Sequence, residues 1–148
     1  MFVYSDHAGD KRTRRSRSGF LIYLNMSLVN WHSKKQSTVE TSVFGAEFLA
    51  MKNGVDTLRG LRYKLSMMGV ALSGPMYIYG DNMSVIKNSS KPESVLNKKS
   101  NLVWYHAVRE SVAMDESRTT HIPGVDNPAD LLANVLSGIK RRRIVNNI

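Results

Sequence analysis

Apolar and polar positions along the first part of the chain follow patterns that are typical of short β-strands. The segments Phe2–Asp6, Ser18–Asn25 and Leu28–Ser33 are rich in aromatic and β-branched residues or alternate apolar with polar side chains. The residues Asn25-Met26-Ser27, between the last two segments, are typical of a tight turn. The pattern therefore predicts three consecutive strands in an antiparallel meander.

The next segment predicts a long helix from about Ser42 to Met68, because its apolar residues recur at steps of three and four. The same steps, continued toward the start of the helix, reach Glu47, which is therefore expected on the face that packs against the sheet. The row that leads to it consists of Met51, Gly54, Leu58, Leu61, Leu65 and Met68.

The second half of the chain predicts two more strands, Met76–Gly80 and Arg118–Ile122, separated by helices. Strands and helices in this order predict an α/β fold in which helices pack on a mixed sheet. The predicted helices are a short one that begins at Asp81-Asn82, an amphipathic one over Ser100–Asp115, and one over Pro128–Ser137 with Asn127 as its N-cap.

Length and composition indicate one domain with a hydrophobic core. The chain has 148 residues, of which 42% are hydrophobic, and it has no apolar run long enough to cross a membrane. Its start lacks the pattern of a signal peptide, so we expect a protein that is not secreted. A strand predicted at the very start favours a domain cut from a larger polypeptide, although a short natural protein could also begin in this way. The absence of cysteine excludes disulfides and cysteine-based zinc sites.

The charge of the chain favours a polyanionic partner. The 21 lysines and arginines exceed the 12 acids and give a formal net charge of +9, which favours nucleic acid first and an anionic membrane second. A basic surface without such a role is the alternative. The basic residues cluster between apolar runs and again at the end, where we expect a domain over residues 1–138 to be followed by a basic tail over 139–148.

Four carboxylates stand out by their positions in the predicted elements, although each has an ordinary alternative explanation. Glu47 lies on an inner helix face, where carboxylates are rare unless they are paired or bind metal, but near a helix N-terminus it can also stabilise the helix dipole. Asp6 ends the first strand and Asp81 the fourth, as turn formers and helix caps do. Asp130 follows Asn127 by three residues, as in a capping box.

Taken together, the four acids suggest a metal site. Carboxylates that converge raise the pKa of one another unless a cation lies between them. Mg²⁺ and Mn²⁺ favour oxygen ligands, and a pair of such ions about 4 Å apart can promote hydrolysis of a phosphodiester. With a basic surface, this favours a phosphodiester hydrolase.

The sequence resembles the ribonuclease H domain of the reverse transcriptase of copia-type LTR retrotransposons. The resemblance is carried, in family order and over nearly the whole chain, by "YSDHAGD", "RSRSGFLIYL", "VNWHSKKQSTVETSVFGAEFLAM", "YIYGDNMSVI", "YHAVRE" and "HIPGVDNPADLL". It implies a five-stranded mixed sheet, with the first three strands antiparallel, flanked by helices. It also implies cleavage of the RNA strand of an RNA/DNA hybrid during reverse transcription.

The resemblance implies that two Mg²⁺ ions, which Mn²⁺ can replace, are held by the four acids. Asp6 would bridge both ions, while Glu47 and Asp81 would hold the ion nearer the leaving group. Asp130 would hold the ion that activates the attacking water.

Three departures from the family pattern favour an alternative, namely a domain that cuts weakly or not at all. Gly45 replaces a second acid that many relatives carry two residues before the glutamate. The loop of residues 124–127 lacks the histidine found in cellular and retroviral enzymes, and His121 lies too early to be expected in that role. Ala133-Asn134 replaces a Thr-Lys pair, so a positive charge near the hybrid is lost.

Polar residues near the acids are candidates for contacts with a hybrid, which is recognised through its 2′-hydroxyls and phosphates. Ser42 and Asn82 could reach 2′-hydroxyls or could cap their helices, and Lys34 and Lys35 could bind DNA-strand phosphates or lie in a solvated turn. Trp31 is expected in the core or against the long helix. The pair Tyr105-His106 is expected to be structural.

Two kinds of function besides catalysis therefore remain open at the level of the sequence. A degenerate domain could bind hybrid or duplex nucleic acid without cutting it, or it could have a structural role in a reverse transcriptase. The expected partners are an RNA/DNA hybrid and the polymerase domain of the same polyprotein, with no membrane. The expected location is the cytoplasm, in the virus-like particle of the element, or the nucleus.

Overall fold

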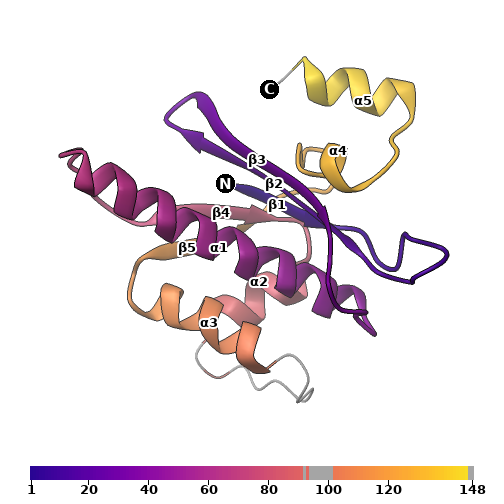
Figure 1. The fold of residues 1–148 in the computed structure, drawn as a ribbon, viewed down its shortest axis with the longest axis horizontal. Coiled ribbons are helices and arrows are strands. Elements are labelled where there is room, and N and C mark those ends of the chain that lie inside the picture. Colours follow the sequence, from indigo (N-terminus) through magenta and orange to yellow (C-terminus); the bar gives the residue numbers. More distant parts are fainter. Residues whose placement is uncertain (92, 94–101, 147–148) are drawn as a thin grey trace.

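The computed structural model describes residues 1–91, 93 and 102–146 and contains a five-stranded sheet with helices on both faces (Figure 1). The strands lie in the order β3-β2-β1-β4-β5. They are β1 (Phe2–Ser5), β2 (Arg17–Leu24), β3 (Ser27–Lys35), β4 (Met76–Gly80) and β5 (Ser117–His121). The helices are α1 (Val43–Met67), α2 (Met83–Ser90), α3 (Leu102–Ala113), α4 (Asp130–Ala133) and α5 (Gly138–Val145).

The first three strands form the predicted antiparallel meander. β1 pairs antiparallel with β2, and β2 pairs antiparallel with β3. Asn25 lies in the turn between β2 and β3 with a φ of 54°, a left-handed conformation that asparagine tolerates better than most residues. The predicted turn at Asn25-Met26-Ser27 is therefore confirmed.

The last two strands run parallel to β1 and make the sheet mixed, as predicted. The long helix α1 provides the crossover from β3 to β4, which pairs with β1 in parallel. β5 pairs with β4, again in parallel. The carboxyl ends of β1, β4 and β5 consequently lie at the same edge of the sheet, just before Asp6, just before Asp81 and at His121.

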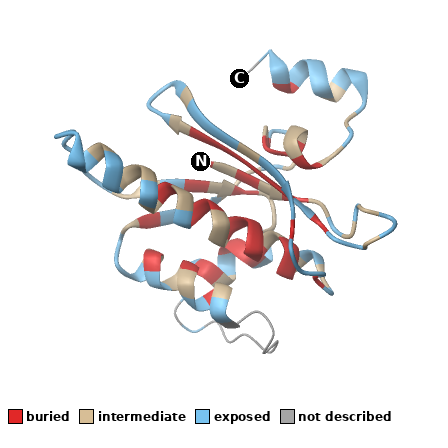
Figure 2. Cartoon of the chain, in the orientation of Figure 1, coloured by how far each residue is buried: buried red, intermediate tan, exposed pale blue. Residues whose placement is uncertain are grey.

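Helices cover the two faces of the sheet unequally. Helices α1, α2 and α3 lie together on one face, whereas α4 and α5 lie on the other (Figure 1). The core between α1 and the sheet is coloured as buried along the inner side of α1 in Figure 2. It contains Met1, Val3, Phe20, Ile22, Phe48, Met51, Val55, Leu58, Ile78 and Val85, among others.

Helix α1 begins as its sequence predicts, and the first half of the predicted row packs against the sheet, whereas Met68 at the end of the row is 77% exposed. Ser42 is its N-cap, and the Ser42 hydroxyl accepts a hydrogen bond from the Gly45 N–H at 3.2 Å. In the predicted row, Met51, Gly54 and Leu58 are buried. Gly54 is close to the Met1 side chain, whose methyl carbon would lie 2.5 Å from an added β-carbon.

The helix predicted over Pro128–Ser137 is wrong in its extent. The chain is helical only in α4 (Asp130–Ala133), and it becomes extended at Asn134 with φ −117° and ψ 153°. The Asn134 side chain donates to Asp130 Oδ1 at 2.7 Å and to the Tyr4 hydroxyl at 3.0 Å. These side-chain bonds hold Asn134 beside Asp130 and Tyr4, at the point where the helix ends.

Helix α5 contains residues that the sequence assigned largely to a basic tail. Within it Ile144 is buried, with 4% of its surface exposed. The division of the chain into residues 1–138 and 139–148 stays a prediction.

Trp31 is not part of the core, contrary to expectation, because 66% of its surface is exposed. It pairs with Leu21, so the two side chains lie on the same face of the sheet. Leu21 is buried, but Trp31 belongs to the edge strand β3, where only Leu28 and His32 are even partly buried. The tryptophan therefore lies beyond the area that α4 covers.

The remaining elements agree with the expected order, with boundaries that shift by a few residues. α3 begins at Leu102, and the predicted start at Ser100 lies outside the described residues. Tyr105 on α3 is buried against Phe48, with ring centroids 5.7 Å apart, which agrees with its expected structural role. Within the described part of the chain, no helix combines the length and apolarity that a membrane crossing needs.

Replacing Gly19 with alanine is expected to lower the free energy of unfolding by about 1–3 kcal/mol, because overpacking displaces neighbouring backbone. An added β-carbon would lie 2.7 Å from Leu132 Cβ and 3.0 Å from the Ala129 carbonyl oxygen, both of α4 or its start. Gly60→Ala is a matched control on the exposed side of α1, with nothing within 4 Å. The Gly60→Ala change should raise the free energy of unfolding by about 0.5–1 kcal/mol, because alanine has a higher helix propensity than glycine. Urea denaturation measures both, and a Gly19→Ala protein as stable as the wild type would contradict this packing.

Candidate active site

Three of the predicted acids are brought to the carboxyl-end edge of the sheet by the topology of the fold. Asp6 directly follows β1 and Asp81 directly follows β4, which pair in parallel. Glu47 lies in the second turn of α1, the helix that packs across β1 and β2. The sheet and the long helix thus supply a common frame for carboxylates that are far apart in the sequence.

Glu47 and Asp81 form an electrostatically coupled pair. Burial, followed by the charge of Asp81, raises the pKa of Glu47 to about 7, against the opposing effect of a hydrogen bond from the Asn82 side chain. Burial likewise raises the pKa of Asp81, and the charge of Asp130 contributes in the same direction. The two carboxylates therefore resist being charged together unless a cation neutralises them.

Asn127 and the loop after β5 hold Asp81 in place. The Asn127 side chain is fully buried; it donates to the Val3 carbonyl oxygen at 2.9 Å and to Asp81 Oδ1 at 3.4 Å. At Gly124 an added β-carbon would lie 2.9 Å from Asp81 Oδ2, so the loop approaches the carboxylate closely there. His121, at the end of β5, places Nε2 3.1 Å from the Asp81 carbonyl oxygen. A histidine therefore does lie beside the site, although not in the loop.

Asp81 is not the N-cap of α2, contrary to one alternative left open by the sequence. Asn82 caps that helix, and its Oδ1 accepts hydrogen bonds from the N–H groups of Ser84 at 2.9 Å and Val85 at 3.3 Å. The capping role therefore belongs to the neighbouring amide, and the Asp81 carboxylate is free of it.

Asp6 is held by the residues that follow it. Its Oδ1 accepts a short hydrogen bond from the Arg17 N–H, and the backbone N–H of Asp6 donates to the Arg17 carbonyl oxygen at 3.1 Å. Gly9 passes so close that an added β-carbon would lie 1.9 Å from Asp6 Oδ2. Arg17, at the start of β2, thus binds the Asp6 carboxylate, and the loop of residues 7–16 passes close to it.

Asp130 is buried, with only 2% of its surface exposed, and its two oxygens have different partners. Asn134 donates to Oδ1 at 2.7 Å, and Lys140 forms an ion pair with Oδ2. The capping-box interpretation of Asp130 is wrong, because α4 begins at Asp130 itself. The N-cap of α4 is Ala129, which makes no side-chain hydrogen bond. The Asn127 side chain instead accepts the Ala129 N–H at 3.1 Å.

Tyr4 is a site residue that the sequence did not single out. Burial and then the charge of Asp130 raise the pKa of the Tyr4 hydroxyl, with smaller contributions from Asp81 and Glu47. The hydroxyl is thereby kept neutral among the carboxylates. Its position two residues before Asp6, on the same face of β1, is the only signal for it in the sequence.

Gln36 is a second such residue and fixes α1 against the sheet. Its buried Nε2 lies 2.8 Å from both the Ser18 hydroxyl and the Ala46 carbonyl oxygen. The bonded carbonyl belongs to the residue before Glu47, so Gln36 helps to set the height of Glu47 over β2. In the sequence, Gln36 stands out only as part of the motif "VNWHSKKQSTVETSVFGAEFLAM", because a single glutamine has no periodic pattern.

The residues fit a divalent cation in their chemistry, but the structure does not assemble all of them. Carboxylate oxygens are the donors that Mg²⁺ and Mn²⁺ prefer, and Glu47 with Asp81 offers two whose mutual repulsion a cation would relieve. Across residues 1–91, 93 and 102–146, no group of three or more acidic, histidine or cysteine side chains is close enough to hold a metal ion. Asp6 Oδ1 accepts the backbone N–H of Arg17, and Asp130 forms an ion pair with Lys140.

The predicted nucleic-acid contacts lie at the surface or beside the acids. Lys34 and Lys35 are exposed at the end of β3, and Lys35 forms an ion pair with Asp10. Ser42 and Asn82 both cap helices, so the capping alternative is confirmed for each. Contacts of these residues with nucleic acid stay predictions.

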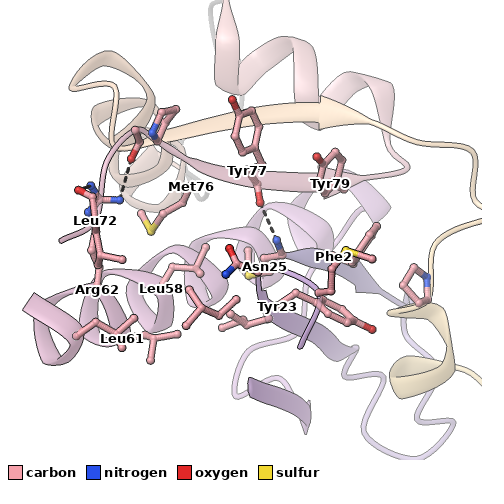
Figure 3. Close-up of a pocket in the computed structure, with 18 of the residues that line it drawn as sticks. Phe2, Tyr23, Asn25, Leu58, Leu61, Arg62, Leu72, Met76, Tyr77 and Tyr79 are labelled. Atoms are coloured by element: carbon pink, nitrogen blue, oxygen red, sulfur yellow. Dashed lines mark hydrogen bonds between the residues drawn. The ribbon is translucent and has the colours of Figure 1, made fainter. Parts of the chain in front are cut away.

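A groove of about 810 Å³ is lined by the start of β1 and β4, the turn between β2 and β3, and part of α1 (Figure 3). Its lining begins at Met1 and Met76 and extends to Asp126, Pro128 and Ile144, but it includes none of the four predicted acids. The Met1 amino group donates to the Tyr77 carbonyl oxygen at 2.7 Å, and burial lowers the pKa of this amine to about 6. Apolar and aromatic side chains dominate the lining, so the groove does not resemble a hydrolytic site.

Comparison with known proteins finds relatives among transposon polyproteins. No protein-family model matches the chain. It is 31% identical over 133 residues to the retrovirus-related Pol polyprotein from transposon RE1 of Arabidopsis thaliana, which covers 90% of this chain and 9% of the polyprotein. It is 30% identical over 135 residues to that from transposon TNT 1-94 of Nicotiana tabacum, covering 91% and 10%. The chain thus spans about a tenth of the length of these relatives.

Solved structures of low sequence identity share the fold. RNase H1 from the halophilic archaeon Halobacterium salinarum aligns over 99% of this chain and 97% of its own, with a TM-score of 0.62 and 16% identity. LC11-RNase H1, isolated from compost by a metagenomic approach, aligns over 89% and 91%, with a TM-score of 0.65 and 19% identity. A structure of LC11-RNase H1 in complex with an RNA/DNA hybrid aligns over 89% and 92%, with a TM-score of 0.62 and 14% identity.

Replacing Glu47 with glutamine is expected to stabilise the metal-free protein by about 1–2 kcal/mol above pH 7. The folded-state pKa of Glu47, about 7, lies above the ordinary value of 4.5, so the folded protein keeps a proton that the unfolded chain has lost. Stability that is fully present below pH 4.5 is therefore lost as the pH rises to about 7.

Urea denaturation in EDTA, at about pH 5 and about pH 8, measures this loss as a change in the free energy of unfolding. The loss should be smaller in Glu47→Gln than in the wild type. Glu110→Gln, an equivalent change at an exposed position of α3, should follow the wild type. An unchanged pH dependence in Glu47→Gln would show that Glu47 is not the group responsible.

Proposed function

Because the chain is homologous to a segment of the retrovirus-related Pol polyproteins of copia-type transposons and has the ribonuclease H fold, we propose that it is a ribonuclease H. The proposed reaction is metal-dependent, endonucleolytic hydrolysis of the RNA strand of an RNA/DNA hybrid during reverse transcription. The observation that carries the proposal is the coupled pair Glu47 and Asp81, placed beside the carboxyl ends of β1 and β4.

Glu47 and Asp81 would hold a divalent cation, with Asp6 and Asp130 as the further proposed ligands. When bound, Mg²⁺ or Mn²⁺ would neutralise the carboxylates and act as a Lewis acid on the phosphodiester. The side chains of Asn82 and Asn127 orient the pair, since each donates a hydrogen bond to one of its carboxylates. The Tyr4 hydroxyl adds no charge beside them, because its pKa is raised. The Asp130 carboxylate is buried and so is kept from bulk water.

The proposed substrate agrees with the charge and the remaining hydrogen-bonding capacity of the chain. A net charge of +9 favours a polyanion. The Ser42 hydroxyl accepts one hydrogen bond as a cap and keeps its own proton to donate. Asn82 has a second amide proton beyond the one directed to Glu47. Lys34 and Lys35 are exposed beside this surface and are proposed to contact phosphates, although a phosphate that binds Lys35 would have to share its ammonium group with Asp10.

The wider setting of the reaction is also proposed. We expect the polymerase domain of the same polyprotein as a partner. The proposed location is the cytoplasm, in a virus-like particle, or the nucleus.

A second candidate function, binding without cleavage, is favoured by the partners of Asp6 and Asp130. Both carboxylates are occupied by groups of the protein, Asp6 by the Arg17 N–H and Asp130 by Lys140. If these contacts persist when nucleic acid binds, the domain would hold a hybrid without assembling a complete metal site.

The proposed activity predicts that the protein cuts a labelled RNA/DNA hybrid in Mg²⁺ or Mn²⁺ and is inactive in EDTA. Asp81→Asn should lower the rate by more than about a hundredfold, since even residues that only support a metal ligand can cost that much. Asp56→Asn makes the same chemical change at an exposed position of α1 and should cut at the wild-type rate. Cleavage that survives EDTA or Asp81→Asn would refute the proposal.

The binding alternative predicts a different outcome with the same hybrid. Affinity should fall steeply between about 50 and 200 mM salt, because each neutralised phosphate releases a counterion. Fluorescence anisotropy measures this fall. The alternative is favoured if the wild-type protein binds the hybrid with this salt dependence but yields no product in Mg²⁺ or Mn²⁺. Measurable turnover would exclude the alternative.

A further inference from the structure

The ion pair between Lys140 and Asp130 brings a basic helix to one of the proposed metal ligands. The Asp130 side chain is only 4% exposed, whereas that of Lys140 is 34% exposed. Lys140 is ten residues away along the chain, on a separate helix, so the contact depends on how α5 packs. A buried carboxylate that is paired with a cation is much more favourable than an unpaired one.

One face of α5 makes the contacts that hold this helix in place. Lys140, Arg143 and Ile144 are spaced at i, i+3 and i+4 and therefore lie on the same face. Arg143 forms an ion pair with Asp126 at 2.8 Å, and Ile144 is buried. Ile139 is 86% exposed, and Arg142 is also exposed. This face thus combines a buried apolar anchor with two cations, of which Lys140 pairs with the buried Asp130 and the largely exposed Arg143 pairs with Asp126.

Lys140 and Asn134 engage the two oxygens of the buried Asp130 carboxylate. The Asn134 side chain donates to Asp130 Oδ1. The cation that pairs with Asp130 within the described part of the chain is Lys140, on Oδ2. Both oxygens of Asp130 are consequently engaged by protein groups.

We propose that Lys140 is an internal counter-ion that competes with a divalent cation for Asp130, and that α5 thereby lowers the affinity of the site for metal. This inference rests on the proposed function, since it treats Asp130 as a metal ligand. A cation that binds Asp130 must displace the Lys140 ammonium group from Oδ2. The ammonium group that is released remains next to the site, where a phosphate of a nucleic acid can pair with it.

Calorimetric titration of the full chain with Mg²⁺, without nucleic acid, tests this competition directly. Lys140→Gln should bind Mg²⁺ about tenfold more tightly than the wild type, because no ion pair has to be broken. Arg142→Gln is the matched control, since it removes the same charge from the exposed side of α5. It should bind Mg²⁺ like the wild type, as should Lys140→Arg, which keeps a cation at the position.

A second variant tests the role of the helix without altering either partner of the ion pair. Asp126→Asn removes the acid that Arg143 contacts and so loosens α5. The change makes the protein more positive, which by itself would weaken metal binding. Tighter binding of Mg²⁺ by Asp126→Asn would therefore support the proposal even if Lys140→Gln folded poorly. The metal-dependent rise in melting temperature of each variant provides an independent reading.

The outcomes separate this inference from the proposed function. Equal Mg²⁺ affinities of the wild type, Lys140→Gln and Asp126→Asn would overturn the inference, while cleavage of a hybrid by the wild type would still support a ribonuclease H. Conversely, tighter binding by Lys140→Gln without cleavage by either protein would leave the counter-ion role standing and refute the proposed enzyme. If Arg142→Gln raised the affinity for Mg²⁺ as much as Lys140→Gln does, the change in net charge alone would explain the effect. That result would overturn the inference.

Discussion

The parallel pairing of β1 with β4 is the constraint on which the rest of the site depends. Because the two strands run in the same direction, Asp6 and Asp81 emerge at the same edge of the sheet. Parallel neighbours need a long crossover, and α1 provides it, so Glu47 is carried across the same edge on the helix that the crossover requires. β5 extends the parallel set and adds His121 beside the Asp81 backbone. The topology that buries the core therefore also gathers the acids.

The acids of this edge differ in how their charge is compensated. Asp6 accepts the backbone N–H of Arg17 at the start of β2, and Asp130 is paired with Lys140. Glu47 and Asp81 accept hydrogen bonds from the side chains of Asn82 and Asn127, respectively. Burial raises the pKa of both, and a neighbouring acid adds to each increase, Asp81 for Glu47 and Asp130 for Asp81. In the proposed site, a cation would be most favoured between Glu47 and Asp81, where it would neutralise the coupled carboxylates. Binding of a cation to Asp130 would, in our proposal, require Lys140 of α5 to be displaced.

What the sequence could predict follows from the range of the interactions involved. Local patterns gave the strands, the turn at Asn25 and the inward face of α1 with Glu47, because periodicity and turn chemistry involve only neighbouring residues. The exposure of Trp31 depends on which strand lies at the edge of the sheet, and the early end of α4 depends on Asn134 reaching Tyr4. The partner of Asp130 likewise required knowing how α5 folds back. Contacts of this kind have no periodic signature.

The edge strand β3 has a consequence for how the protein behaves in solution. One side of the strand pairs with β2, and the other presents unpaired backbone groups next to the exposed side chains of Val29 and Trp31. Such an edge can recruit a strand from another molecule, and lysines are among the residues that discourage this. Lys34 and Lys35 lie at the end of β3, where charged side chains disfavour such pairing. Removing both charges would therefore expose the edge to intermolecular strand pairing.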